Sequence, residues 1–164
     1  MHMSQEGKPV SASRVTVSQL MGTQDTNGHG NVHGGVIMRL ADEAGALASM
    51  RHAQAPTVTI AIDSMTFMEP IYVGNYVQFN AELTYAGRTS MEVRVEVVKE
   101  NPLTGERQIS NTAYIVYVAL DSHRQPTPVP PLIFETPEQE ARAEHAAERQ
   151  AFRKQQRAKE QNTP

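Results

Sequence analysis

The residues best suited to chemistry gather in one short stretch, residues 25–35, which reads DTNGHGNVHGG. Glycines at the start of a helix let a ligand approach the backbone, and the first amide N–H groups of a helix are free donors. Such a stretch can bind an anion or a developing oxyanion. A flexible loop with a glycine-rich helix cap has the same composition. A phosphate loop is excluded, because no Gly-Lys-Ser/Thr is present.

A carboxylate follows about two turns later. Placed at about 100° per residue, Asp42 shares a helix face with Met38, Gly45 and Ser49, between the apolar stripe and the charged solvent side. We expect this small, mixed face to meet a cleft or another subunit. An ordinary exposed helix acid is the simpler alternative.

Other polar groups carry weaker signals. Residues 88–90, Arg-Thr-Ser after Gly87, are either a plain turn between strands or a contact for phosphate. His29, His33 and His52 are irregularly spaced, and the chain contains no cysteine. We therefore expect no metal site, no disulfide and no cysteine nucleophile. No Gly-x-Ser-x-Gly motif supports a serine nucleophile.

The elements that must position these groups form one α+β domain. A short strand is predicted before the glycine-rich loop and a long helix over residues 35–52, on the basis of residue periodicity. Four strand-like segments follow with short turns between them, which favours antiparallel pairing. The predicted strands are residues 14–21, 57–67, 76–85, 90–98 and 109–120.

One helix can cover only one face of such a sheet, and we find no other element in the sequence to cover the second face or an edge. Oligomerisation is expected on this ground alone. We divide the chain into an N-terminal tail (1–11), the domain (12–121), a proline-rich linker (122–136) and a charged helical or disordered tail (137–164).

Composition bounds the possible partners. The chain has 15 Lys and Arg against 18 Asp and Glu, a formal net charge of −3, so no overall charge attracts nucleic acid or anionic membranes. No apolar run reaches the roughly 20 residues that a membrane span needs, and no signal peptide is evident at residues 1–10. We expect a cytoplasmic protein without membrane insertion.

Together, these features resemble the hotdog-fold acyl-CoA thioesterases over residues 12–121. The Asp-Thr-Asn, Gly-Asn-Val-His-Gly-Gly and Asp-Glu segments are similar to the cytosolic acyl-CoA hydrolases. The Asn, His-Gly-Gly and Leu-x-Asp pattern is similar to the phenylacetyl-CoA thioesterase type. The resemblance implies a hotdog fold with about five strands, a homodimer or trimer of dimers (a hexamer), a role in lipid metabolism, and hydrolysis of acyl-CoA without a cofactor, since coenzyme A belongs to the substrate.

The resemblance also implies residue roles. Asp42 is expected to be the catalytic carboxylate, as general base or nucleophile. Gly34 would donate its N–H to the thioester oxygen, Asn27 would position water or the carbonyl, and His33 would support the site. The substrate-binding residues would be Gly35, Arg88, Thr89 and Ser90, the last three on the CoA moiety.

Two alternatives are weighed against this interpretation. A hotdog hydratase or dehydratase would need a His and Asp pair that is not evident. A non-catalytic acyl-CoA-sensing module would be expected to lack Asp42 and to carry a DNA-binding element.

Overall fold

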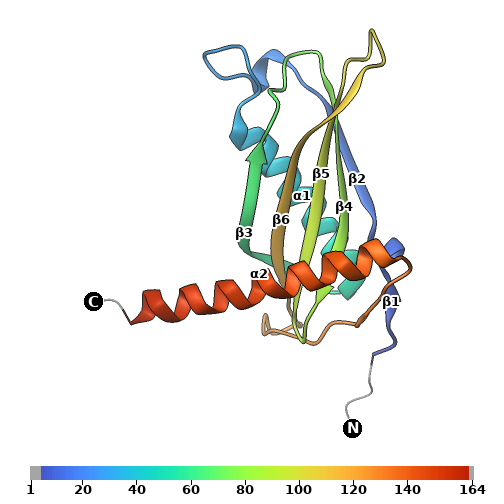
Figure 1. Cartoon of the computed structure of the whole chain (residues 1–164), viewed down its shortest axis with the longest axis vertical. Helices are drawn as coiled ribbons and strands as arrows, with labels where there is room; N and C mark the ends of the chain where they lie inside the picture. Colours follow the sequence, from blue (N-terminus) through green and yellow to red (C-terminus); the bar gives the residue numbers. More distant parts are fainter. Residues whose placement is uncertain (1–4, 163–164) are drawn as a thin grey trace.

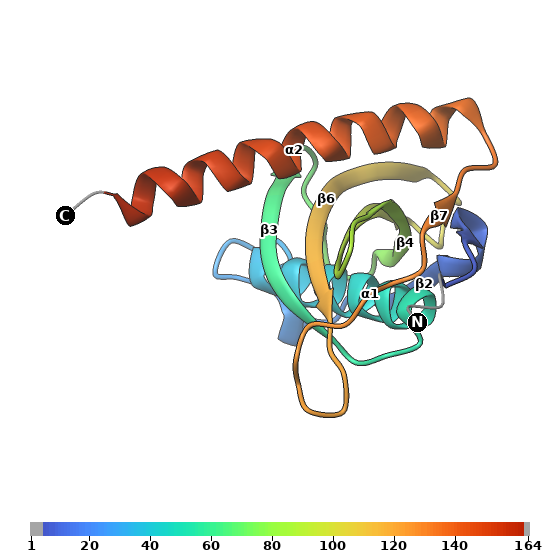
Figure 2. The same ribbon diagram turned by 90° about the horizontal axis from the view of Figure 1, so that it is seen from below.

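A computed structural model describes residues 5–162 of the chain. A five-stranded antiparallel sheet wraps around helix α1 (Gly34–Ala53), and helix α2 (Pro137–Gln161) crosses the outer face of the sheet (Figure 1). Figure 2 shows the curved sheet between the two helices. Residues 1–4 of the predicted N-terminal tail and residues 163–164 of the C-terminal tail lie outside the described residues.

The sheet runs in the order β2-β4-β5-β6-β3, so that β2 and β3 form its edges. The α+β hotdog arrangement predicted from the sequence is confirmed, with a helix between the first and second strands of the sheet. The bounds of the strands are β2 Val15–Leu20, β3 Thr57–Phe67, β4 Tyr76–Ala86, β5 Ser90–Glu100 and β6 Arg107–Ala119.

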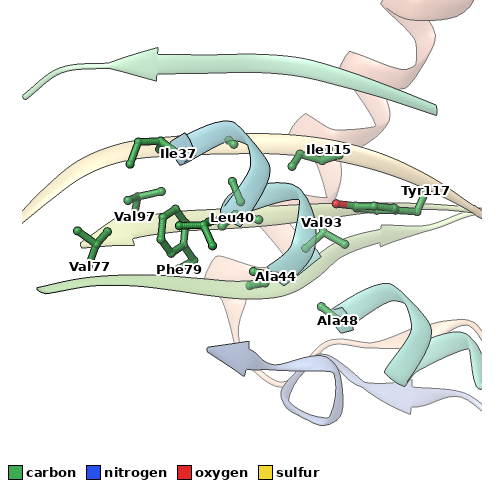
Figure 3. Close-up of a cluster of buried hydrophobic side chains, with 14 of the residues drawn as sticks. Ile37, Leu40, Ala44, Ala48, Val77, Phe79, Val93, Val97, Ile115 and Tyr117 are labelled. Atoms are coloured by element: carbon green, nitrogen blue, oxygen red, sulfur yellow. The ribbon is translucent and has the colours of Figure 1, made fainter. Parts of the chain in front are cut away.

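The core lies between α1 and the concave face of the sheet. Alternate residues of β4, β5 and β6 point inward because side chains of a strand alternate between its two faces. They meet the buried stripe of α1, as Figure 3 shows, through Ile37, Leu40, Ala44 and Ala48.

The register of α1 on the sheet differs from the one predicted. At about 100° per residue, helical periodicity places Leu47 in the apolar stripe against the sheet, yet Leu47 is 46% exposed, while Gly45 and Ser49 are buried. The hydroxyl of Ser49 lies 2.8 Å from that of Thr57 on β3. The helix is therefore rotated so that its small face, rather than Leu47, packs on the sheet.

The outer face of the sheet has a cover that we did not predict. Arg149 of α2 binds Glu92 of β5 through two hydrogen bonds of 3.0 and 2.7 Å, and Glu92 is only 1% exposed. The Arg149 guanidinium also lies 3.9 Å from the centre of the Tyr114 ring. The expectation that no other element could cover this face was wrong, because arginines on a helix whose apolar residues are mostly alanine can dock on buried carboxylates.

Residues 122–136 also contact the domain. Val129 is 6% exposed and donates its N–H to the carbonyl of Arg88 at 2.9 Å. Strand β7 (Leu132–Ile133) pairs in parallel with β1 (Lys8–Pro9), which precedes a short 3-10 turn, η1 (Val10–Ser13). The domain boundaries at residues 11, 121 and 136 stay predictions.

Candidate active site

The glycine-rich loop is held closed at the start of α1. A 3-10 turn, η2 (Thr23–Asp25), ends at Asp25, whose carboxylate accepts the N–H of Gly22 at 2.8 Å and whose carbonyl accepts the N–H of His33 at 2.7 Å. The side-chain oxygen of Asn27 accepts the N–H of His29 at 2.9 Å. The loop is therefore built on asparagine and aspartate contacts with nearby backbone.

His33 caps the helix. Its Nδ1 accepts the N–H of Gly35 at 3.0 Å, which satisfies one of the free donors at the helix start. The N–H of Gly34 has no partner among the described residues. The predicted oxyanion donor is thus left available by a cap that uses the neighbouring amide.

A pocket of about 400 Å³ opens beside this amide. It brings Gly34 and Asn27 together, and the Nδ2 amide of Asn27 has no hydrogen-bond partner within residues 5–162. The rest of the lining is mostly apolar, and includes Val32, Ile37, Phe67, Met68 and Ile71. Two hydrogen-bond donors in an apolar pocket suit a carbonyl group with an apolar chain.

Asp42 sits apart from this pocket, on the part of α1 that faces β3 and β6. Its Oδ1 accepts hydrogen bonds from Thr59 Oγ1 at 2.8 Å and from the Tyr117 hydroxyl at 3.0 Å. Thr59 and Tyr117 are register partners on adjacent strands, so both side chains leave the same face of the sheet. The Oδ2 oxygen has no hydrogen bond to any described residue and is free to meet substrate or water.

The electrostatics of this group favour a donating tyrosine. Burial, followed by the negative charge of Asp42 and the hydrogen bond to it, raises the pKa of Tyr117 well above its usual value. The hydroxyl therefore keeps its proton in the ordinary pH range.

The structure does not unite all the predicted site residues in one chain. Gly34 and Asp42 are separated by about two turns of α1, or about 12 Å along its axis. Residues 88–90 lie at the other end of the sheet from the pocket, where the N–H of Ala119 bonds to the carbonyl of Thr89 at 3.0 Å. Arg88 is exposed there, and its guanidinium has no hydrogen bond to the described part of the chain.

Sequence reasoning missed Thr59 and Tyr117. A threonine and a tyrosine are common strand residues, so neither type suggested a role. The available signal was Gly45, since a glycine inside a helix is costly and usually admits a close neighbour.

The described residues contain neither a metal-binding cluster nor a membrane-spanning helix. Among residues 5–162, no group of three or more His, Cys, Asp or Glu side chains could hold a metal ion. Neither helix in that range has the length and apolar character that crossing a membrane requires.

The fold and the helix-start site define a hotdog thioesterase, and comparison with known proteins agrees. A sequence model described as "Thioesterase superfamily" matches residues 29–106. The chain belongs to this superfamily, as the level of identity to its relatives shows, and it is a thioester hydrolase.

Two curated relatives illustrate that identity. The uncharacterized acyl-CoA thioester hydrolase YkhA of Bacillus subtilis is 39% identical over 134 residues, which cover 82% of this chain and 74% of the relative. The cytosolic acyl coenzyme A thioester hydrolase of Mus musculus is 35% identical over 134 residues, 77% of this chain. The chain matches only 35% of the length of the mouse protein.

Solved structures agree with the fold. An apo-hexameric acyl-CoA thioesterase is 37% identical, covers 94% of this chain and 99% of its own, and superposes with a TM-score of 0.90. An acyl-CoA hydrolase of Staphylococcus aureus, solved with butyryl coenzyme A and coenzyme A, is 32% identical, with 94% of both chains covered and a TM-score of 0.87. Alanine variants of the Staphylococcus enzyme, replacing an aspartate, an asparagine and a threonine, have also been solved.

Proposed function

We propose that this protein hydrolyses acyl-CoA to a free acid and coenzyme A, with Asp42 as the catalytic carboxylate. The observation that carries the proposal is the hydrogen bonding of that carboxylate. Thr59 and Tyr117 hold one oxygen and leave the other free, as a general base or nucleophile requires.

The solved relatives support the residue assignment. The asparagine, aspartate and threonine replaced in the Staphylococcus aureus variants have the same spacing along the chain as Asn27, Asp42 and Thr59. That enzyme was also solved with butyryl coenzyme A. An acyl-CoA is therefore the substrate class we assign to this chain.

The chemistry needs only groups that the chain supplies. In the general-base route, Asp42 Oδ2 takes a proton from water, and the water oxygen attacks the thioester carbon. The charge that develops on the carbonyl oxygen is stabilised by the N–H of Gly34 and the Asn27 amide, and the C–S bond then breaks, so that coenzyme A leaves and takes up the proton. One oxyanion donor is worth about 3 kcal/mol of barrier in other enzymes, and a general base contributes about 10²–10⁴-fold. No cofactor is required.

We infer that two chains complete each site. The Asn27 and Gly34 pocket and the Asp42 carboxylate lie about 12 Å apart along α1, and β3 leaves an unpaired edge. Exposed apolar side chains lie on that edge strand and on the adjacent surface of α1: Val58, Ile60, Ile62, Met38, Leu47 and Met50. Such a surface favours association with a second copy. A trimer of dimers is the assembly we propose, and the apo-hexameric relative supports it.

The proposed contacts for coenzyme A are Arg88, Thr89 and Ser90, with Arg88 binding a phosphate. At the other end of the sheet, His33 and Gly35 shape the start of α1 beside the acyl group. An exposed guanidinium without a partner suits a phosphate. Loss of Arg88 should raise KM more than it lowers kcat. We place this activity in the cytoplasm, as the name of the mouse relative suggests.

The test is release of free thiol from butyryl-, octanoyl-, palmitoyl- and phenylacetyl-CoA by the purified protein. The chain has no cysteine, so a thiol reagent detects only coenzyme A. Release from at least one substrate is expected, and the rates across the set give the acyl preference. A folded protein that releases no thiol from any of them would contradict the proposal.

A further inference from the structure

The buried hydroxyl of Tyr117 lies directly against the proposed catalytic carboxylate. The side chain is fully buried, and its hydroxyl oxygen is 3.0 Å from Asp42 Oδ1 and 2.9 Å from the Asp42 carbonyl. Figure 3 shows the ring lying along the sheet with the hydroxyl turned toward α1. A hydroxyl has one proton to donate, so the proton is shared between two oxygens of one residue.

Gly45 makes this approach possible. A Cβ atom at position 45 would overlap the Tyr117 hydroxyl and come within 3.0–3.1 Å of two ring carbons. Glycine destabilises a helix interior relative to alanine. Its place here, one turn after Asp42, is explained by the tyrosine that it admits.

The tyrosine and Thr59 act on the same oxygen. Both donate to Oδ1, from adjacent strands, so the plane of the carboxylate is set by two fixed side chains. Because Tyr117 belongs to the packed core, its hydroxyl cannot follow the carboxylate if the latter rotates. Oδ2 is thereby directed away from the sheet.

We propose that Tyr117, admitted by Gly45, is a positioning residue that fixes Asp42 Oδ1 and presents Oδ2 to the reacting water or thioester. The inference rests on the proposed role of Asp42. It makes the distance between the helix and strand β6 at this point a determinant of turnover.

The test compares two substitutions that break the same contact from opposite sides. Tyr117→Phe removes the hydroxyl and keeps the ring, whereas Gly45→Ala keeps the hydroxyl and displaces it. Each should lower kcat by about tenfold or more with KM nearly unchanged, the order expected when a hydrogen bond to a charged group is lost. The double variant should lose no more kcat than the more impaired single variant, because both substitutions remove the same interaction.

Tyr114→Phe is the matched control. Tyr114 precedes Tyr117 by three residues on β6, but its ring lies under Arg149 on the outer face of the sheet. This variant should keep kcat and KM of the unmodified protein. Thermal melting of all variants measures the folded fraction, to which the rates are normalised.

Three results would overturn the inference: an unchanged kcat in Tyr117→Phe, additive losses in the double variant, or a loss that disappears after normalisation to folded protein. Failure of the proposed function is recognised separately, by an Asp42→Asn variant that stays active. If Asp42→Asn is inactive while Tyr117→Phe turns over normally, only the positioning role is wrong.

Discussion

The two oxygens of Asp42 have different surroundings. Oδ1 accepts two hydrogen bonds from the sheet, whereas Oδ2 has none from the described residues. A carboxylate held in this way keeps its direction, because two donors on the sheet fix one of its oxygens. The arrangement suits the catalytic role that we propose for Asp42.

At the residue scale, we predict that Asp42→Asn abolishes thioester hydrolysis, with a loss of at least about 10²-fold in kcat. The amide preserves the shape of the side chain but cannot take a proton from water. The loss should be measured by thiol release under saturating acyl-CoA.

The adjacent acid provides the control for this measurement. Glu43 is exposed and pairs with Arg39 at 2.8 Å on the solvent side of α1, so Glu43→Gln should leave kcat unchanged. Equal losses in both variants would mean that helix charge, rather than Asp42 itself, supports the reaction.

At the scale of elements, α1 and the five main strands could be predicted because their periodicity is strong. The predicted strand at residues 57–67 coincides with β3, and the predicted helix at 35–52 falls within α1. The rotation of α1 could not be predicted, because Leu47 and Gly45 reverse the usual relation between hydrophobicity and burial. The approach of Tyr117 depends on pairing between strands distant in the sequence, which periodicity does not report.

We did not predict that helix α2 covers the sheet, because its contacts with the sheet are ionic. We predict that Arg149→Ala lowers the free energy of unfolding by about 3 kcal/mol, since buried Glu92 would lose its hydrogen-bonded arginine and keep only the longer of its ion pairs, with Arg153 at 3.9 Å. Urea denaturation gives the value. Arg142→Ala, which removes a more exposed pair with Glu82, should cost at most about 1 kcal/mol.

The partner substitution sharpens this prediction. Replacing Glu92 and Arg149 together by methionine should recover most of the stability lost in Arg149→Ala, because the Glu92 carboxylate is then no longer buried without its hydrogen-bonded arginine. A loss in the double variant as large as in Arg149→Ala would refute the ionic account of how α2 docks.

His52 links the end of α1 to the segment that leads to α2. Its Nε2 lies 2.7 Å from the carbonyl of Pro130, its Nδ1 is buried without a partner in the described chain, and Lys8 is nearby. Burial, mainly, lowers the pKa of His52, while the hydrogen bond to Pro130 opposes the shift and the charge of Lys8 adds to it.

The sign of the pH effect follows from the lowered pKa. In the unfolded chain, the imidazole of His52 takes up a proton near pH 6.5. In the folded chain, His52 stays neutral at that pH because its pKa is lower. Stability contributed by neutral His52 is therefore complete above about pH 6.5 and declines as pH falls below it. The urea concentration at the unfolding midpoint should decrease when the pH is lowered from 7.5 to 5.5. The decrease should be smaller in His52→Gln.

A surface histidine separates this effect from general acid destabilisation. His145 is exposed on α2, so His145→Gln should keep the pH dependence of the unmodified protein. If His52→Gln and His145→Gln respond to pH alike, the buried histidine is not the cause.

At the scale of the whole molecule, the two parts of the proposed site lie apart within one chain. The pocket with Asn27 and Gly34 lies at the start of α1, and the carboxylate of Asp42 lies about 12 Å further along its axis. A two-fold axis beside the β3 edge would bring the pocket of one copy to the carboxylate of the other. From the sequence, we expected oligomerisation because no element was found to cover the second face of the sheet. Helix α2 covers that face, so the unpaired edge of β3 is the better reason to expect association.

Complementation between two inactive variants tests this account most directly. Asn27→Ala and Asp42→Asn, one carrying a mass tag, are unfolded and refolded as an equal mixture, and mixed dimers are verified by native mass spectrometry. Random pairing makes about half of the dimers mixed, by the symmetry of a two-fold interface. In a shared site, each mixed dimer has one intact site and one doubly altered site. Thiol release should therefore return to about a quarter of that of the unmodified protein, while each variant refolded alone stays inactive. Verified mixed dimers without activity would contradict a site shared between two copies.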